Sequence, residues 1–128
     1  MKSENEISAI VLDSAIAVHK SLGPGLLESA YEECLSFELH DRGLEIVRQY
    51  PIPLLYRNVK LDCSYRADVL VEKRVLVEIK SIETLEGIHT AQVLTYLRLS
   101  GLKLGLLINF NVTLLKDGFH RIVLGMKD

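Results

Sequence analysis

Two amphipathic helices are predicted by the apolar spacing at the start of the chain. Ser3 and Glu6 have the spacing of a capping box, and apolar residues then recur every three or four positions, as on one face of a helix. These residues are Ile7, Ile10, Val11, Ala15, Val18 and Leu22. The Gly-Pro-Gly of residues 23–25 ends the first helix. A second helix is expected over residues 26–41, with Gly43 as its C-terminal cap. Its apolar stripe is Leu27, Ala30, Tyr31, Cys34 and Leu35.

The apolar period then changes to two, which predicts strands. The first strand is expected in residues 45–56, at an edge or irregular because of Pro51 and Pro53. A turn at residues 57–58 follows, and the alternation is clean over residues 61–71. One face is predicted to carry Leu61, Cys63, Tyr65, Ala67, Val69 and Val71. The other face is predicted to carry Asp62, Ser64, Arg66 and Asp68.

The second half of the chain predicts a helix between buried strands. A turn at residues 72–74 leads into the apolar run "VLVEIK", and a third helix is expected over residues 87–100, ending at Gly101. "KLGLLINF" is typical of a strand covered on both faces. "FHRIVLGM" is expected as a final short strand. The predicted order is α-α-β-β-β-α-β-β, which indicates one α/β domain over residues 1–128 with a mixed four- to five-stranded sheet flanked by helices.

Composition places the chain among ordinary globular proteins. Of its 128 residues, 48% are hydrophobic and 25% charged, enough to build a core. The apolar runs are too short to cross a bilayer, so no membrane association is expected. The first residues lack an export signal, which favours a cytoplasmic location with Cys34 and Cys63 reduced. A net charge of −2 argues against tight nonspecific nucleic-acid binding. A small domain with an edge strand can pair with a second copy, so a homodimer is also expected.

The run "RVLVEIKSI" is unusual because Glu78 and Lys80 interrupt a buried strand. A three-residue turn centred on Lys73 would pair Val71 with Val75 and place Asp68 opposite Glu78. Strand side chains alternate, so Lys80 shares the face of Glu78. The opposite face would be filled by Val69, Val71, Val75, Val77 and Ile79.

Two opposed carboxylates repel each other, and Lys80 supplies only one compensating charge. Carboxylate oxygens with open positions suit Mg²⁺ or Mn²⁺, which bind one or two carboxylates together with waters and phosphates. The alternative is a structural salt bridge from Lys80 to either acid. A register slip of one residue would also separate the carboxylates. The geometry alone leaves the metal site and the salt bridge equally open.

Three segments resemble a known nuclease superfamily. "RADVLVEKRVLVEIK" resembles the core motif of the PD-(D/E)xK nucleases, an acid and a hairpin followed by Glu-x-Lys. "GLLESAY" resembles the G-x-x-E-x-x-Y signature of a family of small bacterial and archaeal proteins within it, and "AQVLTYLRLSGLKLGLLINFN" is similar to that family's C-terminal half. The resemblance spans residues 7–124 and implies a restriction-endonuclease-like core. Ala67 stands where many members have proline, at a position that varies in the superfamily.

The resemblance implies a role for each residue of the motif. Asp68 and Glu78 would bind a divalent cation, Mg²⁺ or Mn²⁺, and the backbone carbonyl of Ile79 would complete the ligand set. Lys80 would orient or activate the attacking water and offset charge on the phosphate. Glu28 matches the helical acid that holds the metal directly or through water. Acids are also favoured in the first turn of a helix by its dipole, which is the alternative explanation for Glu28.

Gln92 and Tyr96 lie four residues apart on one helix face. They match a Gln-x-x-x-Tyr motif of RecB-like members, where these residues support the site or contact substrate. A half-buried polar pair over the sheet is the alternative. His19 matches a region that supplies a histidine metal ligand in RecB-like members, and His89 is a weaker match. A lone histidine near a helix end is more often a cap or a surface residue.

The resemblance implies a metal-dependent phosphodiesterase acting on nucleic acid, DNA more than RNA. Arg66 could meet a phosphate of that substrate, or pair with Asp62 or Asp68. The alternative function is a non-catalytic module that keeps the fold for nucleic-acid or protein binding. The net charge of −2 favours this alternative, whereas the complete Asp-Glu-Lys set favours the enzyme. A structural protein without a nucleic-acid role is a third alternative, and it predicts that no divalent ion binds.

Overall fold

The computed structural model describes residues 1–62 and 65–126. Cys63 and Ser64, which the alternation assigned to a strand, lie outside these residues. The helices are α1 (Glu4–Leu22), α2 (Glu28–Asp41), α3 (Gly87–Ser100) and α4 (Leu115–Gly118). The strands are β1 (Ile46–Pro51), β2 (Leu54–Tyr56), β3 (Val59–Leu61), β4 (Arg66–Val71), β5 (Val75–Lys80), β6 (Leu104–Asn109) and β7 (Phe119–Val123).

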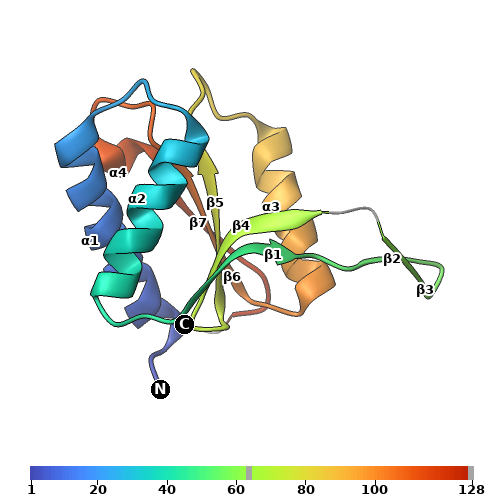
Figure 1. The fold of residues 1–128 in the computed structure, drawn as a ribbon. Coiled ribbons are helices and arrows are strands. Elements are labelled where there is room, and N and C mark those ends of the chain that lie inside the picture. The colour runs from blue at the N-terminus through green and yellow to red at the C-terminus, as the bar shows by residue number, and fades with distance from the viewer. Residues whose placement is uncertain (63–64, 127–128) are drawn as a thin grey trace.

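A mixed five-stranded sheet forms the centre of the molecule. Its strand order is β1-β4-β5-β6-β7, with β5 and β6 parallel and the other neighbours antiparallel. Because parallel strands need a crossover, α3 connects β5 to β6. Helices α1 and α2 cover one face of the sheet and α3 covers the other (Figure 1). The fold is therefore a restriction-endonuclease-like α/β fold, as expected. None of the described helices is long and apolar enough to cross a membrane.

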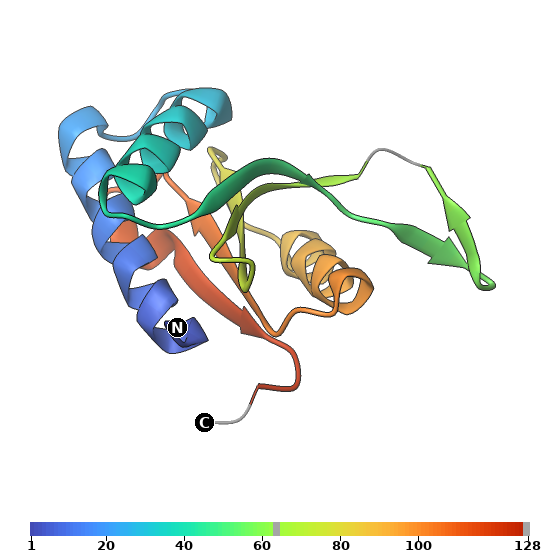
Figure 2. The same cartoon turned by 60° about the horizontal axis from the view of Figure 1, so that its bottom comes forward.

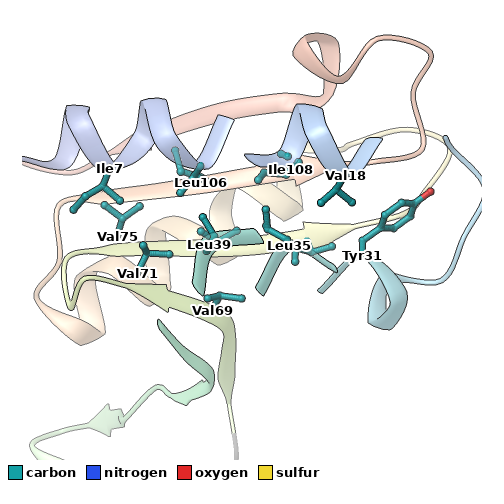
Figure 3. Close-up of a cluster of buried hydrophobic side chains, with 14 of the residues drawn as sticks. Ile7, Val18, Tyr31, Leu35, Leu39, Val69, Val71, Val75, Leu106 and Ile108 are labelled. Carbon is teal, nitrogen blue, oxygen red and sulfur yellow. The ribbon is translucent and has the colours of Figure 1, made fainter. Parts of the chain in front are cut away.

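Two hydrophobic cores hold these layers together. In the larger core, side chains of α1 and α2 meet those of β4, β5 and β6 (Figure 3). The predicted apolar face of the β4–β5 hairpin belongs to it in full: Val69, Val71, Val75, Val77 and Ile79. The second core joins α3 to the opposite face of the sheet. It includes Leu70 and Leu76 from the hairpin with Val93 and Leu97 from α3. The hairpin is thus buried on both sides.

The ends of the first two helices explain the loop between them. The Ser3 hydroxyl accepts a hydrogen bond from the Glu6 backbone at 3.1 Å, which completes the predicted capping box. Tyr31 donates its hydroxyl hydrogen to the Gly23 carbonyl at 2.5 Å, and the Leu26 N–H donates to the same hydroxyl at 3.2 Å. The Tyr31 ring also stacks on Phe110 with centroids 4.5 Å apart. The tyrosine therefore fixes the loop that leads into α2.

The predicted order of elements was incomplete. Residues 45–56 do not form one strand: β1 ends at Pro51 and β2 starts at Leu54, because proline cannot continue a hydrogen-bonded ladder. Within residues 1–62 and 65–126, strands β2 and β3 pair with each other and with no other strand. They flank a turn in which Arg57 and Asn58 have φ of 53° and 65°. This two-stranded arm projects from the rest of the molecule (Figure 2). The short helix α4 was also not predicted.

The prediction that Ala67 shares a face with Val69 and Val71 was wrong. Ala67 lies in the α3-side core, whereas Val69 lies in the opposite core. The alternation is broken at Asp68, the residue between them. On β1, the register places Gln49 opposite Asp68, and Gln49 has φ of 52°. A left-handed residue interrupts the regular pleat, so both strands change direction at this point.

Candidate functional site

Asp68 and Glu78 face each other where the β4–β5 ladder ends. The last backbone pair of this ladder is Val69 with Val77. Beyond this pair, the two strands are joined by hydrogen bonds from main-chain N–H groups to side-chain carboxylates instead of main-chain carbonyls. Glu78 Oε1 accepts a hydrogen bond from the Asp68 N–H at 2.9 Å, and Asp68 Oδ2 accepts one from the Ile79 N–H at 2.7 Å. Each carboxylate is therefore fixed by the main chain of the opposite strand, and the predicted register is confirmed.

Burial makes the charges of this pair costly. Glu78 is only 5% exposed, and this desolvation, followed by repulsion from Asp68, raises its pKa to about 8. Desolvation also raises the pKa of Asp68, although the hydrogen bond from the Ile79 N–H lowers it. Two carboxylates at one place provide oxygen ligands for a divalent cation. The positive charge of the cation would also compensate the negative charge that the two groups cannot carry together.

Lys80 ends β5 beside this pair and is half-buried. Within the described part of the chain it forms no salt bridge with any carboxylate. Its charge nevertheless lowers the pKa of both Asp68 and Glu78, which places the ammonium group near them. The structural salt bridge that was the alternative to a metal site is therefore absent, and the Lys80 ammonium is available to a bound group.

Glu28 is the first residue of α2 and reaches the end of β5. Its Oε2 accepts a hydrogen bond from the Ser81 N–H at 3.1 Å, and the Ser81 hydroxyl donates to the Leu26 carbonyl at 2.5 Å. The charge of Glu28 also raises the pKa of Glu78. Over residues 1–62 and 65–126, however, no three His, Cys, Asp or Glu side chains are grouped closely enough to hold a metal ion. The close carboxylate pair is Asp68 and Glu78, with Glu28 next to it.

Helix α3 brings Gln92 and Tyr96 to the same region. The Gln92 amide donates to the Tyr96 hydroxyl at 3.3 Å. Burial, and then the charge of Glu78, raises the pKa of Tyr96. Both residues line a cavity of about 550 Å³ together with Lys80 and Tyr65. The Gln-x-x-x-Tyr pair therefore lines the same cavity as Lys80, and its role in supporting the site or contacting substrate stays a prediction.

The remaining candidates have other contacts. His19 bonds through Nε2 to the Val112 carbonyl at 2.8 Å, and no described contact joins it to the carboxylate pair. His89 accepts a hydrogen bond from the Glu86 N–H at Nδ1, 2.9 Å, and so caps α3. Arg66 donates to the Gln49 carbonyl at 3.5 Å. Roles for these three residues in metal or phosphate binding stay predictions.

Glu32 and Gln49 adjoin the site and were not identified from the sequence. The Gln49 amide donates to Glu32 Oε1 at 2.7 Å, and Arg48 pairs with Glu32 Oε2 at 2.9 Å. The charge of Glu32 raises the pKa of Asp68, whereas the neighbouring Gln49 amide lowers it. Gln49 therefore links a buried helical acid to Asp68. The sequence feature that could have identified Glu32 is its spacing from Glu28, because residues four apart lie on one face of α2.

Comparison with protein families gives the chain a family. Residues 5–122 match the family model described as the PD-(D/E)XK nuclease superfamily. The chain belongs to this superfamily. Its nucleases generally use divalent metals, and the Asp68–Glu78 pair of this member fits such an ion in donor type, burial and charge. Searches of curated proteins and of solved structures gave no match.

Proposed function

We propose that this protein is a divalent-metal-dependent nuclease, using Mg²⁺ or Mn²⁺, that hydrolyses phosphodiester bonds in DNA or RNA. We further propose that it belongs to the G-x-x-E-x-x-Y family. The observation that carries the proposal is the pair of mutually anchored, desolvated carboxylates next to Lys80, which makes no salt bridge with the carboxylates of the described residues. Perturbed titratable groups gathered in one place are typical of catalytic sites.

The residues that would hold the metal are Asp68, Glu78 and the Ile79 carbonyl, with Glu28 reaching it through a water molecule. A bound divalent ion stabilises the negative charge that develops on a phosphate during hydrolysis. The protein contributes the fixed positions of the two carboxylates, because main-chain N–H groups hold one oxygen of each. Glu78 also loses its proton more readily when a cation is near, since the cation offsets the repulsion that raises its pKa.

Lys80 would act on the phosphate and the attacking water. Its ammonium group donates hydrogen bonds but accepts none, so it can orient a water molecule through the water oxygen and contact a phosphate oxygen. Because no carboxylate engages it in a salt bridge in the described structure, it need not give up an ion pair to do so. Lys80 is therefore expected to contribute to stabilising the transition state and to contribute little to binding the metal.

Cleavage assays with matched lysine variants test this proposal. Wild type, Lys80→Ala and Lys103→Ala are compared on supercoiled plasmid, single-stranded DNA and RNA in Mn²⁺. Lys103 is exposed and precedes β6, at the end of the sheet opposite Lys80. We expect Lys80→Ala to lower the cleavage rate by about 10²-fold or more, with Mn²⁺ affinity nearly unchanged and Lys103→Ala active.

Two results would contradict the proposal. If wild type does not bind Mn²⁺, the carboxylate pair is structural. If Lys80→Ala cleaves as fast as wild type, the cleavage comes from another site or from a contaminant. A wild type that binds nucleic acid and Mn²⁺ but cuts none of the substrates would support the non-catalytic module, which the net charge of −2 favours.

A further inference from the structure

The cavity beside Lys80 is formed by two parts of the chain. Helix α3 supplies most of its wall, including Gln92 and Tyr96, while Leu54 and Tyr65 come from the base of the β2–β3 arm. Both views show the arm leaving the sheet on the side where α3 lies (Figures 1 and 2). The volume of about 550 Å³ is within the range of small-molecule sites.

The lining of this cavity suits a flat, aromatic group. Tyr65 is 47% exposed, and its ring lies 6.3 Å from that of Tyr96 at an interplanar angle of 56°. Leu54 and Leu99 add apolar surface. Aromatic side chains that are partly open to solvent bind nucleobases by stacking, and they accept every base because each base has a π face.

Charge indicates an unpaired strand rather than a duplex. Binding through the backbone of a duplex depends on many lysine and arginine contacts to phosphate. This chain has a net charge of −2, and among the described residues that line the cavity one is a lysine, Lys80, and one a histidine, His89. Stacking has to supply a large share of the affinity. A base inside a duplex has both faces covered by its neighbours, but an unpaired base can enter a cavity.

We propose that this cavity, formed by Tyr65, Leu54 and α3, is a subsite for one unpaired nucleobase. The inference rests on the proposed nuclease function, and it names single-stranded nucleic acid as the substrate class. Lys80 lines the cavity, and it follows Glu78 by two residues on β5, so both side chains lie on the same face of the strand. The base in the subsite therefore belongs to a nucleotide adjacent to the phosphate that is cut.

Binding of fluorescent oligonucleotides in Ca²⁺ tests the subsite. The variants are Tyr65→Ala, Tyr65→Phe and Tyr56→Ala. Tyr56 is the matched control, because it lies on the same arm, is 64% exposed and does not line the cavity. We expect Tyr65→Ala to weaken single-strand binding at least about tenfold and Tyr65→Phe to restore it, because stacking needs the ring and not the hydroxyl. Tyr56→Ala should stay within about twofold of wild type.

Abasic substitutions in the oligonucleotide identify the contact directly. A single abasic site is moved along the strand, and wild type should lose affinity at one position. Tyr65→Ala should show no further loss at that position, because the partner of the base is already gone. Duplex binding should be weaker than single-strand binding and insensitive to Tyr65→Ala.

The outcomes separate the subsite from the nuclease. Equal effects of Tyr65→Ala and Tyr56→Ala, or an abasic effect that is the same in wild type and Tyr65→Ala, would overturn the subsite while leaving Lys80-dependent cleavage intact. Conversely, base-dependent and Tyr65-dependent binding without any cleavage in Mn²⁺ would support the subsite and contradict the nuclease.

Discussion

Gln49 has a backbone conformation that few residues other than glycine adopt, with φ of 52°. Such conformations are unfavourable and persist where the surrounding structure holds them, often at functional sites. Here the conformation allows two consecutive residues, Arg48 and Gln49, to reach Glu32. Gln49 also lies opposite Asp68 in the register of β1 and β4, and its amide lowers the pKa of that carboxyl. The strained residue thus positions a candidate metal ligand.

Replacing Gln49 should therefore weaken metal binding more than it weakens the fold. We expect Gln49→Ala to lower Mn²⁺ affinity by about 10- to 100-fold, the range seen when groups that orient a ligand are removed. Isothermal titration measures this affinity, and thermal unfolding in EDTA measures stability. Gln92→Ala is the control, because Gln92 bonds to Tyr96 rather than to a carboxylate. Equal Mn²⁺ affinity in Gln49→Ala and wild type would show that Asp68 needs no such support.

At the residue scale, the sequence predicted the site residues whose positions follow from a short turn between two strands. The turn at residues 72–74 sets the register of the hairpin, so Asp68, Glu78 and Lys80 could be grouped from counting alone. Glu32 and Gln49 could not be found in this way. The β2–β3 arm separates β1 from β4, so no tight turn fixes their register, and a left-handed residue does not show in a period-two pattern.

The layer formed by α3 and the sheet depends on Gly105 in β6. A Cβ atom at this position would clash with Val93 Cγ1 of α3 and would lie 3.6 Å from Leu97 Cδ1. Glycine therefore permits α3 to approach the sheet closely. Because α3 also lines the cavity beside Lys80, this approach helps to set the width of the proposed subsite.

Gly105→Ala should lower stability by forcing the helix away from the sheet. Overpacking in a core destabilises proteins by about 1–3 kcal/mol, which urea unfolding can resolve. Gly87→Ala is the control, since a Cβ at Gly87 meets nothing within 4 Å, and alanine in a helix is more favourable than glycine by up to about 1 kcal/mol. If the two variants were equally stable, Val93 would have moved aside without cost.

At the element scale, caps, turns and the two strands joined by a short turn were predictable, whereas the strand partners that are distant in sequence were not. The bounds of α3 match the prediction because Gly101, with φ of 72°, ends the helix in the left-handed conformation. The turn at Arg57 and Asn58 was also predicted correctly. Alternation over residues 61–71 indicated one strand, but β3 pairs with β2 whereas β4 pairs with β1 and β5. Alternation reports which side chains are covered, and it does not identify the strand that pairs.

The carboxylate pair ties the stability of the whole molecule to pH. The pKa of Glu78 is about 8 in the folded protein, against an ordinary value of 4.5. Between these values the folded state holds a proton that the unfolded state has lost. The metal-free protein should therefore become less stable as pH rises from 4.5 to about 8, and the loss should level off above that range.

Urea unfolding in EDTA across this pH range measures the effect. We expect the Glu78 contribution to reach a slope of up to about 1.4 kcal/mol per pH unit, and Glu78→Gln should remove it. The glutamine keeps an oxygen that can accept from the Asp68 N–H, so the fold is preserved. The difference between the two proteins reports the titration of Glu78 together with its interaction with Asp68. A difference that does not vary with pH would mean that the buried carboxylate ionises normally.

Metal should reverse the penalty that the pair imposes on the fold. Above about pH 8, where Glu78 has lost its proton, Asp68 and Glu78 repel each other in the metal-free protein, and Lys80 offsets this only in part. Asp68→Asn removes the repulsion and keeps an oxygen to accept from the Ile79 N–H. We therefore expect this variant to melt at a higher temperature than wild type in EDTA above about pH 8, where both wild-type carboxylates are ionised. Wild type should gain about 2.7 kcal/mol at a metal concentration one hundred times its dissociation constant, and the variant much less because it lacks a ligand.

The melting temperatures of the two proteins should thus converge or cross as Mg²⁺ or Mn²⁺ is added. Thermal unfolding across a metal titration measures both curves, and a Ca²⁺ titration shows whether the effect depends on the smaller ions. A lower melting temperature for Asp68→Asn in EDTA, together with a wild type that does not respond to metal, would mean that the pair is a structural device joining β4 to β5. The reciprocal hydrogen bonds would then be the whole function of these carboxylates, and only membership of the superfamily would support a nuclease.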